Sequence, residues 1–175
     1  MDIERIEKAV KEIIIAIGED PERSGLKASP KRIALAYKKI FNGINRDPEK
    51  EIQDFLEDKY HDLIILKNLE FMSICEHHLM PFFGKINIAY LPNDQGNIVS
   101  FGRIREIVKI LCSRPQIQER LNNEIAEVLY KKLEAKALVV SIEALHVCMM
   151  IDDMKKSPEI KTIRSLGQEI PNLCF

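Results

Sequence analysis

Cysteine and histidine are scarce in this chain of 175 residues, and most of them gather in two segments that lie far apart in the sequence. The first segment holds Cys75, His77 and His78, and the second holds His146 and Cys148. Zinc prefers thiolate and imidazole ligands, and a catalytic zinc takes three protein ligands and leaves a fourth position for water. If folding brings the segments together, Cys75, His78 and Cys148 can bind zinc. The imidazoles of His77 and His146 would then lie beside the metal, free to move protons.

The spacing inside each segment favours a shared site. Cys75 and His78 are three residues apart, so in a helical or tight turn their side chains point the same way. His146 and Cys148 are two apart, and on an extended segment both would face one side of a sheet. A lone cysteine is more often a small buried hydrophobe, which suits Cys112. That interpretation suits the two segments poorly, because each contains both residue types.

Charge and composition narrow the class of protein. The formal net charge is −1 at pH 7, so no nucleic-acid or membrane partner is expected from gross electrostatics. No apolar run approaches the length of a membrane span. At the N-terminus acidic Asp2 and Glu4 are mixed with Arg5 and no apolar signal core follows, so we expect a cytoplasmic protein. Four cysteines, two of them close to histidine, indicate metal binding or free thiols rather than disulfides.

Hydrophobic spacing predicts helices first and strands later. Asp2 can cap a helix that ends at Gly18, and Ser29 can cap a second helix that stops near Gly43. The charged residues 46–61 are expected to form a loop with at least one helical turn. Further along, the pattern predicts strands at 63–66, 85–91, 97–100, 137–146 and 160–166, a helix at about 103–112, and another helix that starts from a capping box at 113–116.

This order of elements predicts an α+β domain in which helices pack on one face of an antiparallel sheet. We expect a helical N-terminal region at 1–60 and one compact catalytic unit at 61–175. The other face of the sheet, or its edges, would need a partner, so we expect a homo-oligomer.

The vacant position on the predicted zinc is suited to hydrolysis. Zinc lowers the pKa of a bound water to about 7. Two imidazoles near their titration range can give or accept protons beside it. The combination fits hydrolysis of a C–N bond. A zinc nucleoside deaminase would fit as well, but its P-C-x-x-C element is absent from this sequence.

Longer stretches around the two segments resemble the GTP cyclohydrolase I family. These stretches are residues 73–84, 88–92, 114–121 and 146–149, with 18–26 and 29–32 upstream. The resemblance implies a tunnelling fold (T-fold), in which subunit sheets join into a barrel, and a homodecamer of two pentamers with active sites at subunit interfaces. It also implies that the imidazole ring of GTP is opened and C8 leaves as formate. The product would be 7,8-dihydroneopterin triphosphate, a precursor for folate or tetrahydrobiopterin synthesis.

The resemblance assigns a role to each candidate residue. His77 would protonate the imidazole nitrogen of the purine, and His146 would act on the ribose oxygen. Glu119 would accept hydrogen bonds from the guanine N–H groups, although by itself it fits a solvated acid in the first turn of a helix. The other residues carried over are Cys75, His78 and Cys148 as ligands of Zn²⁺, Gln118 in the guanine pocket, and Arg103 and Arg32 for the phosphates.

Three positions depart from the cations that the family usually carries, and here they hold Leu35, Glu106 and Asp152. Charge-assisted hydrogen bonds contribute roughly 1.5–3 kcal/mol each, so triphosphate binding should weaken unless neighbours such as Arg105, Lys155 and Lys156 compensate. Three hypotheses therefore stay open. The chain is a GTP cyclohydrolase I, or a paralogue that applies the same zinc chemistry to a less phosphorylated guanine or pterin compound, or a non-catalytic pterin-binding oligomer.

Overall fold

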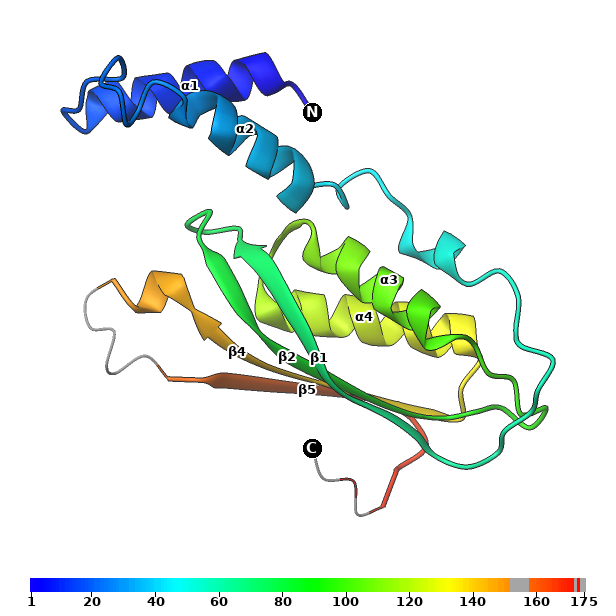
Figure 1. The fold of residues 1–175 in the computed structure, drawn as a ribbon. Helices are drawn as coiled ribbons and strands as arrows, with labels where there is room; N and C mark the ends of the chain where they lie inside the picture. The colour runs from blue at the N-terminus through cyan, green and yellow to red at the C-terminus, as the bar shows by residue number, and fades with distance from the viewer. Residues whose placement is uncertain (152–157, 172, 174–175) are drawn as a thin grey trace. The chain divides into compact units, whose positions relative to one another are not determined.

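The computed structural model describes residues 1–151, 158–171 and 173 (Figure 1). The chain forms two compact units, Met1–Asn42 and Gly43–Phe175. Within the described residues no helix is long and apolar enough to cross a lipid bilayer. Three residues named above, Asp152, Lys155 and Lys156, lie outside the described part of the chain, and so does the fourth cysteine, Cys174.

The first helix of the N-terminal unit, α1, spans Ile3–Ala16 and begins where its cap predicts. Asp2 accepts a hydrogen bond from the backbone N–H of Arg5 at 3.0 Å, which satisfies one of the free donors at the helix start. Val10 and Ile14 are its buried residues, one turn apart on the apolar stripe. The predicted helix is confirmed.

The second helix, α2, spans Ser29–Ile40 and packs against α1. Ser29 is its first helical residue rather than its cap, because Ala28 takes the cap position and makes no side-chain bond there. Helix ends shift by a residue or two in this way without changing the helix itself. Ala34 is fully buried in this unit.

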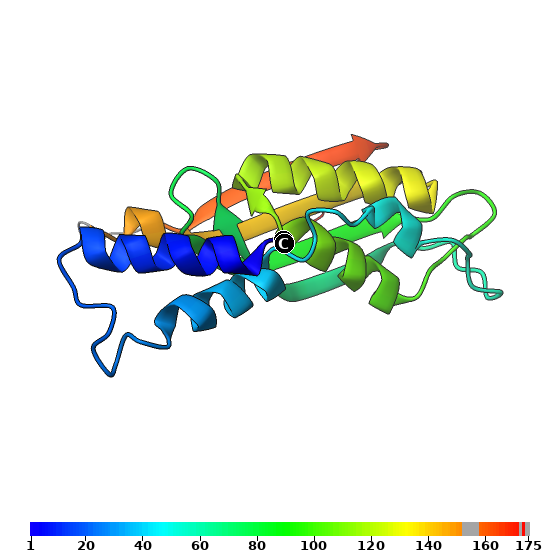
Figure 2. The same cartoon turned by 90° about the horizontal axis from the view of Figure 1, so that it is seen from above.

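The second unit is a five-stranded sheet with helices on one face (Figures 1 and 2). The strand order is β3-β1-β2-β4-β5, and every pairing is antiparallel except the short one between β1 and β3. Two long helices, α3 and α4, run along the same face of the sheet, so the predicted α+β class is confirmed. The bounds are β1 Ile64–Cys75, β2 Pro81–Leu91, β3 Pro115–Gln116, β4 Ala137–His146, β5 Ile160–Gly167, α3 Phe101–Cys112 and α4 Gln118–Leu133, with 3-10 turns η1 at Pro48–Glu51 and η2 at Val147–Met149.

The core lies between the sheet and the two long helices. Alternate residues of β2 and β4 point to this face, as the period of a strand requires. Each fully buried aliphatic or aromatic side chain contributes roughly 1.5–3 kcal/mol of transfer free energy. The fully buried core residues on these four elements include Phe82, Ile86, Ile88, Val140, Ile142, Ile104, Ile107, Leu121, Ile125 and Leu129.

A β-bulge interrupts β1 between Leu66 and Leu69. Asn68 sits there with φ of 59°, and its backbone N–H donates to Oδ1 of the buried Asn87 on β2 at 2.8 Å. Asparagine tolerates this left-handed conformation better than most residues. The bulge bends β1, which is much longer than the strand that the sequence predicts at 63–66.

Two predicted features are wrong. Residues 97–100 form no strand, and Asn97 makes only an isolated bridge with Lys59, because a turn closed by the Asn93 side chain holds this segment. The predicted capping box at 113–116 does not start α4. Ser113 instead ends α3, and the next residues extend to pair with β1 as β3, so the helix begins only at Gln118.

Candidate active site

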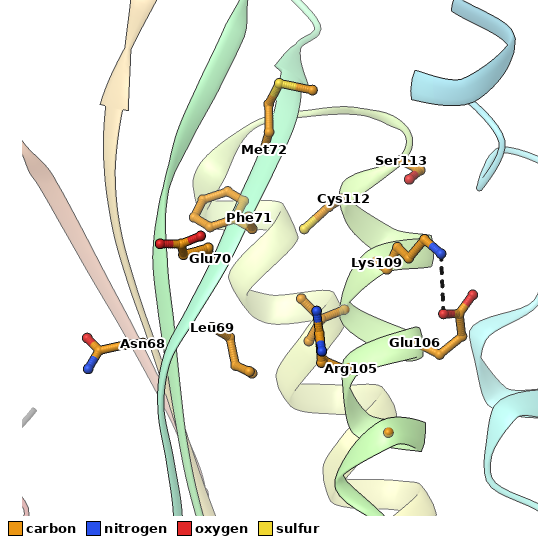
Figure 3. A pocket seen from close by; sticks show the side chains of 12 residues that line it. Asn68, Leu69, Glu70, Phe71, Met72, Arg105, Glu106, Lys109, Cys112 and Ser113 are labelled. Carbon is orange, nitrogen blue, oxygen red and sulfur yellow. Dashed lines mark ion pairs between the residues drawn. The ribbon is translucent and has the colours of Figure 1, made fainter.

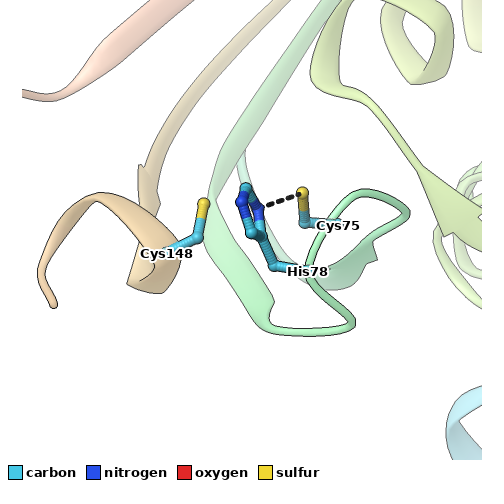
Figure 4. Close-up of side chains that lie close together, drawn as sticks. All are labelled: Cys75, His78 and Cys148. Atoms are coloured by element: carbon cyan, nitrogen blue, oxygen red, sulfur yellow. Dashed lines mark hydrogen bonds between the residues drawn. The ribbon is translucent and has the colours of Figure 1, made fainter.

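The first cysteine–histidine segment is the tight turn between β1 and β2. The backbone N–H of Cys75 donates to Met80 O at 2.8 Å, and Leu79 N–H donates back to Cys75 O at 2.9 Å. Leu79 has φ of 54°, which lets the chain reverse within a few residues. The turn brings Sγ of Cys75 to 3.8 Å from Nδ1 of His78, as the three-residue spacing predicts (Figure 4).

Glu76, inside this turn, ties it to the start of α4. Its backbone N–H donates to Gln116 O at 3.0 Å, and its carboxylate is paired with Arg120. The hydrogen bond from Arg120 lowers the pKa of Glu76. Arg120 also donates from Nε to Gln116 Oε1 at 2.9 Å, so both partners are held. His77 remains on the outer side of the turn, with 64% of its side chain exposed.

Cys148 reaches the same place from β4. The expectation that it lies on an extended segment is wrong, because β4 ends at His146 and the chain winds into the 3-10 turn η2, closed by a bond from Met150 N–H to Val147 O at 3.0 Å. Phe82 at the start of β2 pairs with His146, so sheet register carries the end of β4 to the β1–β2 turn. Figure 4 shows the Cys148 sulfur facing His78.

The three predicted ligands converge. The ligand atoms of Cys75, His78 and Cys148 all lie within 4.8 Å of one another. Tetrahedral zinc, with bonds of about 2.3 Å to sulfur and 2.0 Å to nitrogen, separates such atoms by about 3.5 Å. The measured 3.8 Å between Cys75 and His78 is close to that value. Burial, together with the neighbouring Cys75 thiol, raises the pKa of Cys148. A bound cation would favour the thiolates instead, so the donor set fits zinc.

His146 stands next to this group and is held on two sides. Its ring stacks on the fully buried ring of Phe82, with centroids 4.8 Å apart and planes 2° from parallel. Its Nε2 lies 2.8 Å from Oε1 of Gln118. Burial lowers the pKa of His146, while the charge of Glu119 acts in the opposite direction. An imidazole held in this way is suited to moving protons in a fixed direction.

Glu119 is exposed in the first turn of α4. It lines a small cavity of about 270 Å³ together with residues of the same helix and of β5, among them Asn123 and Arg164. An exposed carboxylate beside a cavity can accept N–H donors from a planar ligand. It can equally be a solvated helix acid, and its role stays a prediction.

The predicted phosphate side carries mixed charge. Arg103 is 61% exposed at the start of α3, and its guanidinium lies 3.9 Å from Glu51. Glu106, one turn later, pairs with Arg46 at 2.8 Å and with Lys109 at 3.6 Å. The hydrogen bond from Arg46 lowers the pKa of Glu106. The carboxylate that replaces a family cation is therefore neutralised by its own neighbours.

A larger cavity of about 680 Å³ lies between β1 and α3 (Figure 3). Arg105 and Lys109 line it from the helix, together with Glu70 from the strand and the buried ring of Phe71. Among the described residues Arg105 makes no ion pair, so its guanidinium is available to an anion. Arg32, the other predicted phosphate contact, is exposed on α2 of the first unit.

Sequence reasoning missed Phe82 and Arg120. Phe82 stands next to the zinc-site turn in the sequence, but only the register of β2 against β4 places it under the His146 ring. Arg120 follows Glu119 on α4, and its bond to Glu76 joins residues 44 positions apart. No local pattern predicts such a contact.

Comparison with known proteins agrees with this geometry. A family model described as GTP cyclohydrolase I matches residues 6–170. A protein named GTP cyclohydrolase 1 from Thermobifida fusca is 41% identical over 94% of this chain and 79% of its own length. Its namesake from Caldanaerobacter subterraneus is 44% identical over 94% of this chain and 87% of its own.

Among solved structures, an archaeosine synthase QueF-Like protein in the apo form aligns over 64% of this chain and 100% of its own at 14% identity, with a TM-score of 0.49. The five-stranded sheet with two long helices on one face is compatible with the tunnelling fold that the family resemblance implies. Because the family model spans nearly the whole chain and relatives above 40% identity align along most of both lengths, this chain belongs to the GTP cyclohydrolase I family.

Proposed function

We propose that this protein is a cytoplasmic, zinc-dependent GTP cyclohydrolase I. It hydrolyses the purine C8 of GTP and yields formate and 7,8-dihydroneopterin triphosphate. The observation that carries the proposal is the convergence of Cys75, His78 and Cys148 in a chain whose relatives are named GTP cyclohydrolase 1. Such a donor set selects zinc over harder cations.

Cys75, His78 and Cys148 would hold the metal. Zinc in this place supplies a Lewis acid that makes water a nucleophile at neutral pH. The turn that carries two of the ligands is held by Glu76 and Arg120, so the ligands need little rearrangement on binding.

The other two histidines of these segments, His77 and His146, divide the proton transfers. His77 is largely exposed, with Nε2 4.0 Å from Oε1 of Glu76, and it donates a proton to the imidazole nitrogen of the purine, which makes C8 electrophilic. His146, fixed by Phe82 and Gln118, moves a proton at the ribose oxygen during ring opening. Imidazole can both donate and accept a proton, so it suits both tasks.

Glu119 recognises the base. Its carboxylate accepts hydrogen bonds from the N–H groups of the guanine edge, and the backbone beside Gln118 completes the pocket. Adenine presents a different pattern of donors and acceptors, so it would leave the carboxylate poorly paired. The exposed position of Glu119 beside a small cavity supports this assignment.

The phosphates are assigned to Arg103 and Arg32, with Arg105 as a further cation. The local pairing of Glu106 with Arg46 and Lys109 supports this, because it cancels the negative charge that would repel a phosphate. The same pairing also occupies Arg46 and Lys109. It therefore supports a second candidate substrate, a guanine nucleotide or pterin compound with fewer phosphates.

We further propose that the protein works as a homo-oligomer. The size that we propose is the decamer that the family resemblance implies. On one side of the described sheet β1 pairs with β3 only at Ile74 and Cys75, and on the other side β5 is the last strand. Large apolar side chains are exposed on or near these strands: Met72 is 50% exposed and Ile163 is 59% exposed. Free edges and exposed apolar residues of this kind are normally covered by a partner.

The test is turnover by the zinc-loaded protein. GTP is added, and formate and the pterin chromophore are measured together. Cys148→Ser should abolish turnover, while Cys112→Ala, which alters a buried cysteine outside the cluster, serves as the matched control. Absence of turnover in a protein that has bound zinc and assembled would reject the proposal and favour a non-catalytic pterin-binding oligomer.

A substrate series distinguishes the two candidate substrates. GTP, GDP, GMP and guanosine are compared at equal concentrations with the same zinc-loaded protein. A steep loss of kcat/KM when the γ-phosphate is removed supports the triphosphate. Equal or better activity on GMP supports the less phosphorylated substrate.

A further inference from the structure

The side chain of Gln118 has its polar atoms committed inside the protein. Gln118 is 2% exposed at the first position of α4. Its Nε2 donates to the main-chain oxygens of Ile142 at 3.1 Å and Ile160 at 2.9 Å. Its Oε1 faces Nε2 of His146 at 2.8 Å. Both ends of this amide therefore have hydrogen-bond partners inside the protein.

These contacts fix which end of the amide faces His146. Main-chain carbonyl oxygens only accept hydrogen bonds, so the end of Gln118 that faces Ile142 and Ile160 must be the NH₂ group. The oxygen therefore faces His146. An amide oxygen also only accepts, so Nε2 of His146 must carry the hydrogen of this bond. The tautomer follows from the surrounding carbonyls and not from an arbitrary choice of amide orientation.

Stacking on Phe82 is a second contact of the His146 ring, and it keeps the ring in the plane that the hydrogen bond to Gln118 requires. The His146 ring lies parallel to Phe82, which has no exposed surface and packs edge-to-face on Phe71. Rotation of the imidazole about its own axis would break either the stacking or the bond to Gln118. One nitrogen is thus held inward, and Nδ1 is the nitrogen that remains for exchange.

We infer that Gln118 is a positioning residue, which holds His146 in the Nε2–H tautomer and makes Nδ1 the working nitrogen. Nε2 stays bonded to Gln118, and Nδ1 is the ring nitrogen left to face a substrate. The chemical step that uses this nitrogen rests on the proposed function. The assignment of the tautomer does not.

The tautomer can be measured directly. Zinc-loaded protein labelled with ¹⁵N in histidine has only four imidazoles to assign by solid-state NMR, and His146→Asn identifies the signals of His146. We expect a protonated Nε2 and an unprotonated Nδ1 for His146 at neutral pH. A protonated Nδ1 with a bare Nε2 would overturn the inference.

Variants at Gln118 test its consequence. Gln118→Met removes the acceptor and keeps the length of the side chain, so the tautomer preference of His146 should be lost and kcat should fall by about 10–100-fold with a smaller change in KM. Gln118→Glu keeps an acceptor and should restore the Nε2–H signal and part of kcat. A Met variant with unchanged kcat and an unchanged His146 spectrum would contradict the positioning role.

Leu129 supplies the matched control. It is fully buried about three turns further along α4, in the core between this helix and the sheet. Leu129→Val disturbs the packing of the same helix away from Gln118 and His146, so the spectrum and kcat should stay as in the unaltered protein. If Leu129→Val lowers kcat as much as Gln118→Met, general loss of packing explains both and the inference fails. If no variant turns over GTP but the NMR result holds, the proposed function fails alone.

Discussion

The substitution Phe82→Leu tests two roles of Phe82, which are to stabilise the core and to orient the ring of His146. Phe82 is fully buried and makes two ring contacts, stacked on His146 at 4.8 Å and edge-to-face with Phe71 at 5.8 Å. Leucine fills most of the same space, so the cavity left behind is small. The change removes both ring contacts and keeps an apolar side chain at the same place in β2.

The magnitude follows from these two contacts. Aromatic pairs contribute about 0.5–1.5 kcal/mol each beyond area burial, so the unfolding free energy should fall by about 1–3 kcal/mol. For a domain of this size each kcal/mol lowers Tm by about 2–4 °C. A ring that is free to tilt also spends less time in the productive orientation, and kcat should fall by about tenfold.

Thermal unfolding and GTP turnover are measured side by side at one protein concentration, because assembly would shift Tm. Ile88→Leu is the matched control, since Ile88 is fully buried further along β2 on the same face and does not contact His146. It should cost less than about 1.5 kcal/mol and leave kcat unchanged. The reasoning is refuted if Phe82→Leu lowers Tm as expected while its kcat equals that of Ile88→Leu.

Three further predictions follow from single features. The hydrogen bond from Arg46, and to a smaller extent the charge of Lys109, lower the pKa of Glu106. The ionised Glu106 therefore stabilises the fold at pH values above the ordinary glutamate pKa of about 4.3. This stability is lost as the pH falls through the lowered pKa of Glu106 in the folded protein. Glu106→Gln should therefore cost about 0.5–1 kcal/mol at pH 7, and the difference should close in acid when urea unfolding is compared across pH. Tyr90 has a fully buried hydroxyl with no partner among the described residues, and burial raises its pKa to about 12, so Tyr90→Phe should leave Tm equal or higher by calorimetry. Removing metal with a chelator should abolish GTP turnover and expose the Cys75 and Cys148 thiols to a thiol reagent, and added zinc should reverse both effects; thiols that react equally in metal-loaded protein would contradict the ligand assignment.

The sequence predicted the parts of the site that depend on local spacing. The three-residue separation of Cys75 and His78 predicted two side chains on one side of a turn, and the turn has that geometry. The strand at 137–146 was predicted with the bounds that β4 has, because it is a nearly continuous apolar run rich in β-branched residues, as buried strands are. Helices α1 and α2 followed from caps and periodicity in the same way.

Contacts between segments that are distant in the sequence could not be predicted from local residue spacing. The two-residue separation of His146 and Cys148 suggested an extended segment, but the chain leaves the sheet at His146 and winds into η2. The spacing is compatible with both conformations, and only the position of the β1–β2 turn decides between them. Gln118 was placed in a substrate pocket from resemblance. Its side chain could not be assigned to His146 without knowing that β4 and β5 present carbonyl oxygens to it.

The pairing register of β2 and β4 determines both which residues are buried in the core and where the candidate catalytic residues lie. Phe82 is buried on the same face of β2 as Ile86 and Ile88, and it pairs across the strands with His146. A slip of one residue between β2 and β4 would turn the apolar residues of one strand out of the core, so the register is fixed by burial. The same register sets His146 beside Phe82 and brings η2 to the β1–β2 turn. The free energy that buries the core thereby also holds the cysteines and histidines together before any metal or substrate binds.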